Sequence, residues 1–268
     1  NHAEATFCWF LPDGSALFSF DRAPISGNEE FRSARITIEV VEPGKTLSAL
    51  FKGRAHHLAS PRLLLDPKNA FTSSPEVPAE MALLLEGVSP LYGGKPFPGL
   101  DVGGHYEQHM RAEGELKFEG STTRVLALGN RDHSWGPRVW QATHADRTVW
   151  CTFGSDFGIA FSITWRSATP DKYEVIVEVW RNESMTKVVD VSIRSEFEDS
   201  ARLLHSAFRA HLRLADGSSL ELSGRAMEIA PLRHRRNEKV PHIGWAMTEL
   251  VSDGPPGVGL AEYLDLNE

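Results

Sequence analysis

The chain has 268 residues and a formal net charge of −8; 41% of its residues are hydrophobic and 24% are charged. These values are ordinary for a soluble globular protein and exclude a wholly disordered or collagen-like chain. No apolar run reaches the roughly 18 residues that a membrane helix needs, so we expect no membrane span. Nucleic-acid binders usually carry a basic face, so the acidic balance also argues against a nucleic-acid partner.

The cysteines and the basic residues carry little functional signal. Cys8 and Cys151 lie far apart in the sequence and form neither a disulfide framework nor a zinc-binding spacing. We expect both thiols to be reduced and buried, which favours a cytoplasmic protein. A basic cluster at residues 233–236, followed by Lys239, is interpreted as a solvated loop.

Alternation of apolar and polar residues is the dominant pattern along the chain. It is clearest at residues 35–40, 174–180 and 208–214. Successive side chains of a strand point to opposite faces, so this pattern predicts half-buried strands, about sixteen in all. Turn signals separate them, at Asp13-Gly14, Pro43-Gly44, Glu119-Gly120, Asp216-Gly217 and Asp253-Gly254.

These strands are linked by short turns, without the helical crossovers of a parallel sheet, which favours antiparallel barrels or sandwiches. Roughly eight strands lie on each side of residue 135, and eight strands can close a barrel with room for one small ligand. We therefore predict an all-β fold of two antiparallel barrels or half-barrels packed together, with few short helices. The expected domains are residues 1–135 and 136–268.

A proline- and glycine-rich stretch at residues 66–104 interrupts the alternation. It predicts a long loop with at most one short element, at residues 78–86, which could be a helix or a strand. Loops of this length are usually functional lids or disordered links. A second glycine-rich segment, at residues 257–259, is interpreted as a turn.

Residues 129–138, with the sequence GNRDHSWGPR, form the densest group of chemically useful side chains. On a continuing strand, His133 shares a face with Arg131 and Trp135, whereas Asp132 faces the other way. His133 suits general acid or base work because its ordinary pKa is about 6.5. The structural alternative is a polar plug in which Asp132 pairs with Arg138.

A second polar group begins at His105. On a strand, one face would carry a row of ionisable side chains that is too polar for a dry core: His105, Glu107, His109 and Arg111. We expect this row to face solvent or to line a wet cavity. The next predicted strand, residues 121–130, is its expected hairpin partner, which would place His105 beside residues 131–133.

Metal and cofactor binding are not predicted. His105 and His109 would stand about 13 Å apart on a strand, too far to share one ion. A mononuclear site of His105, Glu107 and His133 across strands stays open as a minor alternative. The phosphate-binding and dinucleotide-binding glycine motifs and the serine nucleophile elbow are missing from the sequence.

The string RDHSWG at residues 131–136 resembles the signature of a bacterial family of double lipocalin-like proteins. That family is similar to carotenoid 1,2-hydratase and to AttH-like proteins, within the calycin group. Weaker matching pieces lie at residues 105–108 and 257–263, and the first hundred residues match only as an alternating β region. The resemblance implies the double lipocalin-like fold and a cavity, in a group that includes hydratases and pericyclic cyclases.

We predict a cofactor-independent enzyme (a lyase or hydratase, an isomerase or a cyclase) that moves a proton on a hydrophobic aromatic or isoprenoid small molecule in a barrel cavity. The predicted catalytic residues are His133, Asp132 and Glu107. The predicted substrate-binding residues are Arg131, Arg138, Trp135, His105, Tyr106 and Trp140. The alternative is a lipocalin-like carrier of a hydrophobic small molecule without catalysis, and a protein-interaction module is a weaker third hypothesis. The sequence is compatible with a monomer or a homodimer.

Overall fold

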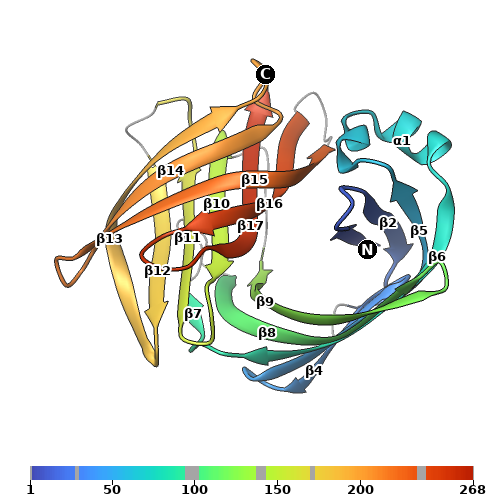
Figure 1. Cartoon of the computed structure of the whole chain (residues 1–268), viewed down its shortest axis with the longest axis horizontal. Coiled ribbons are helices and arrows are strands. Elements are labelled where there is room, and N and C mark those ends of the chain that lie inside the picture. The colour runs from blue at the N-terminus through green and yellow to red at the C-terminus, as the bar shows by residue number, and fades with distance from the viewer. Residues whose placement is uncertain are drawn as a thin grey trace. The chain divides into compact units, whose positions relative to one another are not determined.

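The structure is a computed structural model that describes residues 2–27, 30–93, 103–136, 143–169, 173–233 and 240–267. Within these ranges the chain forms seventeen strands, one 3-10 helix and one α-helix (Figure 1). The prediction of an all-β fold with few short helices is confirmed. No helix in the described ranges has the length and apolarity needed to cross a membrane, and the cytoplasmic location stays a prediction.

The strands of the N-terminal half form an antiparallel sheet, with the order β1-β2-β5-β6-β8-β7 along its main path. β4 pairs with β3 and β5, and β9 pairs with β8. The strands are β1 (His2–Phe10), β2 (Ala16–Pro24), β3 (Phe31–Ser33), β4 (Ile36–Glu42), β5 (Thr46–Leu58), β6 (Glu76–Gly87), β7 (Tyr92–Gly93), β8 (Gly104–Phe118) and β9 (Ser121–Trp135).

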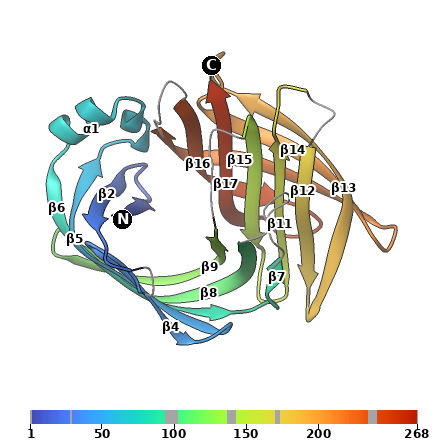
Figure 2. The same ribbon diagram turned by 180° about the vertical axis from the view of Figure 1, so that it is seen from behind.

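The strands of the C-terminal half form a closed antiparallel barrel, in which each strand pairs with the next and β10 pairs with β17 (Figure 2). They are β10 (Ala145–Thr152), β11 (Phe157–Trp165), β12 (Tyr173–Arg181), β13 (Ser184–Phe197), β14 (His205–Leu214), β15 (Ser219–Arg233), β16 (Val240–Val251) and β17 (Gly257–Asn267). The alternation at residues 174–180 and 208–214 corresponds to β12 and β14.

Contacts between residues in space divide the chain into two compact units. The first unit comprises Asn1–Gly87 and Met110–Leu128, and the second comprises Val88–His109 and Gly129–Glu268. β8 and β9 therefore each contribute residues to both units. The predicted domain boundary at residue 135 stays a prediction, and the candidate site described below belongs wholly to the second unit.

Within the predicted loop at residues 66–104, the short element expected at residues 78–86 is part of the strand β6 (Glu76–Gly87), but the expected loop is wrong over residues 67–73, which form a helix. α1 (Pro67–Ser73) begins there because Pro67 suits a first helical turn and the Asp66 carboxylate accepts a hydrogen bond from the Asn69 N–H at 3.3 Å. The strand β6 follows it (Figure 2). Pro78 lies opposite Arg54 of β5, whereas pairing of β6 with β8 begins only at Ala79, so Pro78 is paired on one side alone.

The interior of the barrel is filled by inward-facing apolar side chains at alternate strand positions, among them Val149, Ile159, Phe161, Val179 and Leu212. The segment at residues 257–259 belongs to β17, so its interpretation as a turn is wrong. A side-chain carbon at Gly259 would lie 2.0 Å from the Trp150 carbonyl oxygen, so glycine is required there by the close approach of β10.

Candidate active site

The candidate site begins at the β8–β9 hairpin, whose predicted pairing is confirmed. Glu119 and Gly120 join the strands with φ values of 49° and 77°, and two consecutive positive φ values are the signature of a type I′ turn. Because the strands run antiparallel, this turn brings the first residues of β8 beside the last residues of β9. β7 adds a short edge through the pairing of Tyr92 with Glu107.

Two hydrogen bonds between β8 and β10 fix the first residues of β8 to the outside of the barrel. Val149 and Cys151 point into the barrel core, so Trp150 and Thr152 point outwards. The Trp150 indole N–H donates to Glu107 Oε2 at 2.6 Å, and Thr152 Oγ1 lies 2.9 Å from the Nδ1 of His109. The barrel wall therefore supports the site from one side.

Glu107 is a buried carboxylate whose Oε2 atom accepts three hydrogen bonds. The donors are the Tyr92 hydroxyl at 2.9 Å, the Trp150 indole at 2.6 Å and the Asn130 amide at 3.3 Å. Burial raises the pKa of Glu107, and the neighbouring His105 opposes that rise. The carboxyl group is thus held rigidly, with a proton affinity above that of an exposed glutamate.

His105 lies between two carboxylates. Its Nε2 atom is 2.8 Å from Asp132 Oδ1 and 3.4 Å from Glu107 Oε1. The side chains of His105 and Glu107 are 11% and 7% exposed, whereas that of Asp132 is 37% exposed. We call these three groups the Asp132 row: both carboxylates face the same nitrogen of His105, and the group is buried at Glu107 and open at Asp132. Such a row can hold a proton and exchange it at its open end.

A cluster of rings occupies the opposite face of the two strands. The Tyr106 ring lies 5.1 Å from the His133 ring and 6.0 Å from the Trp135 ring, measured between centroids. Arg131 stacks over Tyr106 at 4.7 Å and donates a hydrogen bond to its hydroxyl. Gly104 makes room for this cluster, because a side-chain carbon there would lie 2.3 Å from the Trp135 ring.

The electrostatics of this face differ from those of the Asp132 face. Burial lowers the pKa of His133, and the positive charge of Arg131 lowers it further. The Nη1 atom of Arg131 is buried and has no hydrogen-bond partner among the described residues. His133 is thus biased towards its neutral form, beside the guanidinium group of Arg131.

His109 attaches β8 to the barrel wall through its hydrogen bond with Thr152. The expectation that its side chain faces solvent or a wet cavity is wrong. The residue is fully buried, and its ring stacks on Trp180 with a centroid distance of 5.6 Å. Thr152 donates its own hydroxyl hydrogen to the Gly129 carbonyl, so it accepts one from His109 Nδ1. Burial lowers the pKa of His109 to about 4.

The fourth member of the predicted row behaves differently. Arg111 is exposed and pairs with Glu86 within the first unit, with 2.5 Å between its Nη2 and a carboxylate oxygen. Of the four residues predicted to form one polar row, three therefore lie in the second unit, whereas Arg111 forms a surface ion pair in the first unit.

The structure brings some predicted site residues together and separates others. Asp132 and Glu107 meet at His105, which was predicted to bind substrate, whereas His133 packs with Tyr106 and Trp135. Arg138 and Trp140, and the suggested pairing of Asp132 with Arg138, lie outside the described residues. The roles of all these residues stay predictions.

Sequence reasoning missed three residues that bind Glu107: Tyr92, Asn130 and Trp150. Asn130 immediately precedes the RDHSWG string, so its proximity to that string is a usable signal. Trp150 lies between Val149 and Cys151, which point into the barrel core, and its outward position could have marked it as a partner for another strand. Tyr92 lies in the proline- and glycine-rich stretch, where no periodicity indicates its contacts.

One donor set among the described residues could hold a metal ion. One ligand atom each from His105, Glu107 and Asp132 lies within 4.8 Å of the other two. A nitrogen and two carboxylate oxygens suit a divalent cation. The metal site considered as a minor alternative from the sequence had His133 where this set has Asp132. The absence of a metal stays a prediction.

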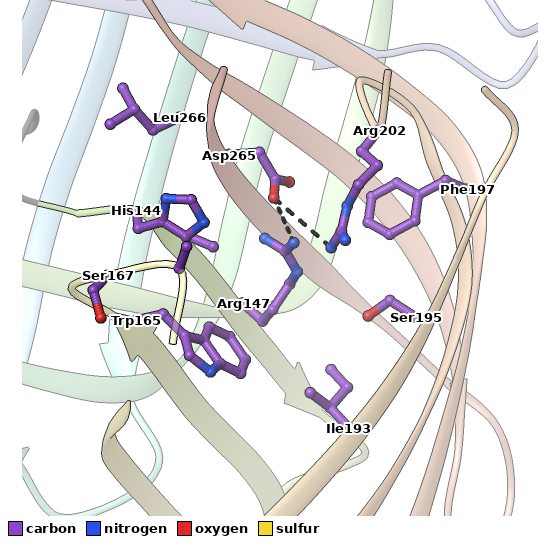
Figure 3. A pocket seen from close by; sticks show the side chains of 12 residues that line it. His144, Arg147, Trp165, Ser167, Ile193, Ser195, Phe197, Arg202, Asp265 and Leu266 are labelled. Atoms are coloured by element: carbon purple, nitrogen blue, oxygen red, sulfur yellow. Dashed lines mark hydrogen bonds and ion pairs between the residues drawn. The ribbon is translucent and has the colours of Figure 1, made fainter. Parts of the chain in front are cut away.

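The barrel contains a cavity of about 500 Å³ at the end where β10 begins and β17 ends (Figure 3). We call it the barrel-mouth cavity. Its lining includes none of the predicted site residues that the structure describes. A hydrophobic ligand in this cavity would therefore not touch Asp132 or His133 as long as the lining keeps this arrangement.

Comparison with protein families gives a match over almost the whole chain. A family model described as a domain of unknown function, DUF7064, matches residues 1–267. The chain belongs to the DUF7064 family. No curated protein matches this DUF7064 chain.

Solved structures similar to this DUF7064 protein include an AttH-like protein from Nitrosomonas europaea. It is 12% identical, with a TM-score of 0.50 over 96% of this chain and 90% of that chain. CghA is 12% identical, with a TM-score of 0.47 over 96% of this chain and 80% of that chain. Kievitone hydratase from Nectria haematococca is 9% identical, with a TM-score of 0.47 over 98% and 83%.

At these identities the likeness concerns the fold alone. The predicted similarity to AttH-like proteins is confirmed at that level. The predicted similarity to carotenoid 1,2-hydratase stays a prediction.

Proposed function

We propose that this DUF7064 protein is an acid–base enzyme of the lyase or isomerase type, which adds or removes a proton on a hydrophobic small molecule. The observation that carries the proposal is the position of His105 Nε2, 2.8 Å from Asp132 and 3.4 Å from Glu107. Hydration, dehydration, double-bond isomerisation and cyclisation all need a positioned proton donor or acceptor of this kind.

In this proposal Asp132 exchanges the proton with the substrate, because it is the exposed member of the row. His105 is the positioning residue: its imidazole orients Asp132 and stabilises negative charge on the carboxylate. Glu107 lies on the other side of the same His105 nitrogen, with 3.4 Å between its Oε1 and Nε2. The three donors to Glu107 Oε2 leave Oε1 directed towards His105, which keeps the row in one geometry.

His133 is the second candidate for proton transfer, and Arg131 favours it. A guanidinium group with an N–H that has no partner among the described residues can stabilise a developing oxyanion, and the imidazole of His133 lies on the same face. The half-exposed ring of Trp135 would contact an apolar substrate on that face. The two candidates lie on opposite faces of β9, so single substitutions separate them.

The test uses small-molecule extract of the source cells, incubated with the wild type, Asp132→Asn, His133→Gln or His211→Gln and followed by untargeted mass spectrometry. His211 is the matched control, since it is a half-exposed histidine in an ion pair with Glu221 on the outside of the barrel. We expect wild type and both histidine variants to convert one compound, and Asp132→Asn to be slower by about 10² to 10⁴. A mass change of 18 Da would identify hydration or dehydration, and an unchanged mass would indicate isomerisation or cyclisation.

Other outcomes redirect or end the proposal. Loss of conversion in His133→Gln, with Asp132→Asn fully active, would transfer the proton step to His133. A compound that stays bound to every variant without being converted would overturn the enzyme proposal and establish the carrier alternative. The barrel-mouth cavity is the observation that favours a carrier.

A further inference from the structure

The barrel-mouth cavity carries its own chemistry, separate from the Asp132 row. It opens at one end of the barrel, and its walls come from the ends of several strands (Figure 3). Trp165, Ile193 and Phe197 supply apolar surface, while Arg147, Arg202 and Asp265 supply charge. Its volume of about 500 Å³ lies within the range of about 300–1,000 Å³ that is usual for small-molecule sites.

Arg147 is a fixed cation in the cavity wall. Its side chain is 3% exposed, and its guanidinium donates to the Leu264 carbonyl at 2.9 Å and to Asp265 Oδ1 at 2.7 Å. The Tyr263 ring packs against it at 4.5 Å. Arg147 and Asp265 therefore form a neutral, buried pair that shapes the cavity without adding net charge to it.

Arg202 supplies the unbalanced positive charge. It lies 3.8 Å from the same Asp265 oxygen, beyond hydrogen-bond distance, and its side chain is 55% exposed. Two guanidinium groups facing one carboxylate leave a net charge of about +1 at the cavity, which suits a ligand with one negative charge. Arg202 keeps N–H donors in contact with water, and a ligand oxygen can replace that water.

The backbone holds Arg202 in an unusual conformation over the cavity. Its φ of 59° lies in the left-handed region, which non-glycine residues rarely adopt. The turn is fixed by Asp199, whose carboxylate accepts hydrogen bonds from the Leu203 and Leu204 N–H groups at 3.2 and 3.0 Å. The Arg202 guanidinium consequently stacks over the Phe197 ring at 4.5 Å, at the edge of the cavity.

Ser195, in the cavity lining, is hydrogen-bonded to the Tyr263 hydroxyl. Ser195 Oγ and the Tyr263 hydroxyl are 2.8 Å apart. Burial raises the pKa of Tyr263 to about 12, so the phenol keeps its proton and can donate it to Ser195. The Ser195 hydrogen is then available to a ligand oxygen on the cavity side.

We propose that the barrel-mouth cavity binds an amphipathic monocarboxylate, with its carboxylate on Arg202 and Ser195 and its apolar body against Trp165 and Ile193. A guanidinium group matches the two oxygens of a carboxylate, and Trp165, Ile193 and Leu266 supply apolar lining for the rest of the ligand. This site shares no residue with the Asp132 row, so it does not depend on the proposed enzymatic function.

The test compares three soluble probes with one apolar body: 4-phenylbutyrate, 4-phenylbutanol and 4-phenylbutylammonium. Isothermal titration calorimetry on the full chain should show 4-phenylbutyrate binding at least about tenfold more tightly than the alcohol, and no binding of the ammonium. Arg202→Asn removes the charge but tolerates the left-handed backbone. It should weaken 4-phenylbutyrate binding by at least about fivefold and leave the alcohol unchanged.

The matched control is Arg225→Asn. Arg225 is also an exposed arginine in an ion pair, with Glu249, and it is absent from the cavity lining. It makes the same change in net charge, so it should leave binding of all three probes unchanged. Equal affinity for the acid and the alcohol, equal effects of the two substitutions, or no binding of any probe would each overturn the proposal.

Discussion

Gly158 decides whether His109 can lie against the barrel. It belongs to β11, and a side-chain carbon there would be 2.5 Å from Cε1 and 2.7 Å from both nitrogens of the His109 ring. Such distances are far inside van der Waals contact. Gly158→Ala must therefore displace the His109 ring, which is fully buried between β11 and Trp180.

The cost has two parts. Overpacking a well-filled site costs about 1–3 kcal/mol. Displacing the ring also breaks the 2.9 Å hydrogen bond between His109 and Thr152, and a buried group without its partner costs about 1–3 kcal/mol. Because part of the strain is relieved when the bond breaks, we expect Gly158→Ala to lower the free energy of unfolding by about 2–4 kcal/mol.

Urea denaturation followed by tryptophan fluorescence measures this change. Gly129→Ala is the matched control: it is a strand glycine in the same unit, and a side-chain carbon there meets open space. Its effect should stay within about 0.5 kcal/mol. In a His109→Ala background, which removes the ring, Gly158→Ala should cost less than about 0.5 kcal/mol. An equal cost of Gly158→Ala in both backgrounds would refute the steric argument.

Two further predictions concern ionisation. Burial raises the pKa of Glu107 above its ordinary value of 4.5, so wild type loses stability as the pH rises above that value, whereas Glu107→Gln does not. The difference in free energy of unfolding, variant minus wild type, should therefore grow between pH 5 and pH 8 in urea denaturation. A difference that stays constant over this range would contradict the burial of Glu107. Burial also lowers the pKa of His109 to about 4 and that of His205 to about 3. The NMR signals of both rings should keep their neutral shifts from pH 8 to pH 5.5, and a midpoint near 6.5 would contradict the structure.

The strands were predictable because a half-buried strand alternates apolar and polar residues along the sequence. Residues 208–214 alternate without interruption and correspond to β14. β6 was harder to predict, because consecutive leucines at residues 83–85 hide its alternation and Pro78 suggests a break. Gly259 was misinterpreted because the close approach of β10, which requires glycine there, comes from a strand that pairs with it across the barrel closure.

The candidate site was predictable as far as one hairpin determines it. Antiparallel pairing of β8 with β9 was enough to expect His105 near residues 131–133. The partners of Glu107 were not predictable, because Tyr92 and Trp150 lie 15 and 43 positions away along the chain. Their positions depend on how β7 and the barrel wall meet β8, which local periodicity does not encode.

During synthesis, the barrel cannot close before its last strand, β17, has been made. The pair of Arg147 and Asp265 joins residues 118 positions apart, on the two strands that seal the barrel. A ribosome that adds about 5–20 residues per second needs on the order of ten seconds between these two residues. During that interval β10 has an unpaired edge, which is open to wrong pairing with other chains. The nascent protein is therefore most vulnerable to aggregation just before its last barrel strand emerges, and chaperone protection at that stage should matter most for its yield.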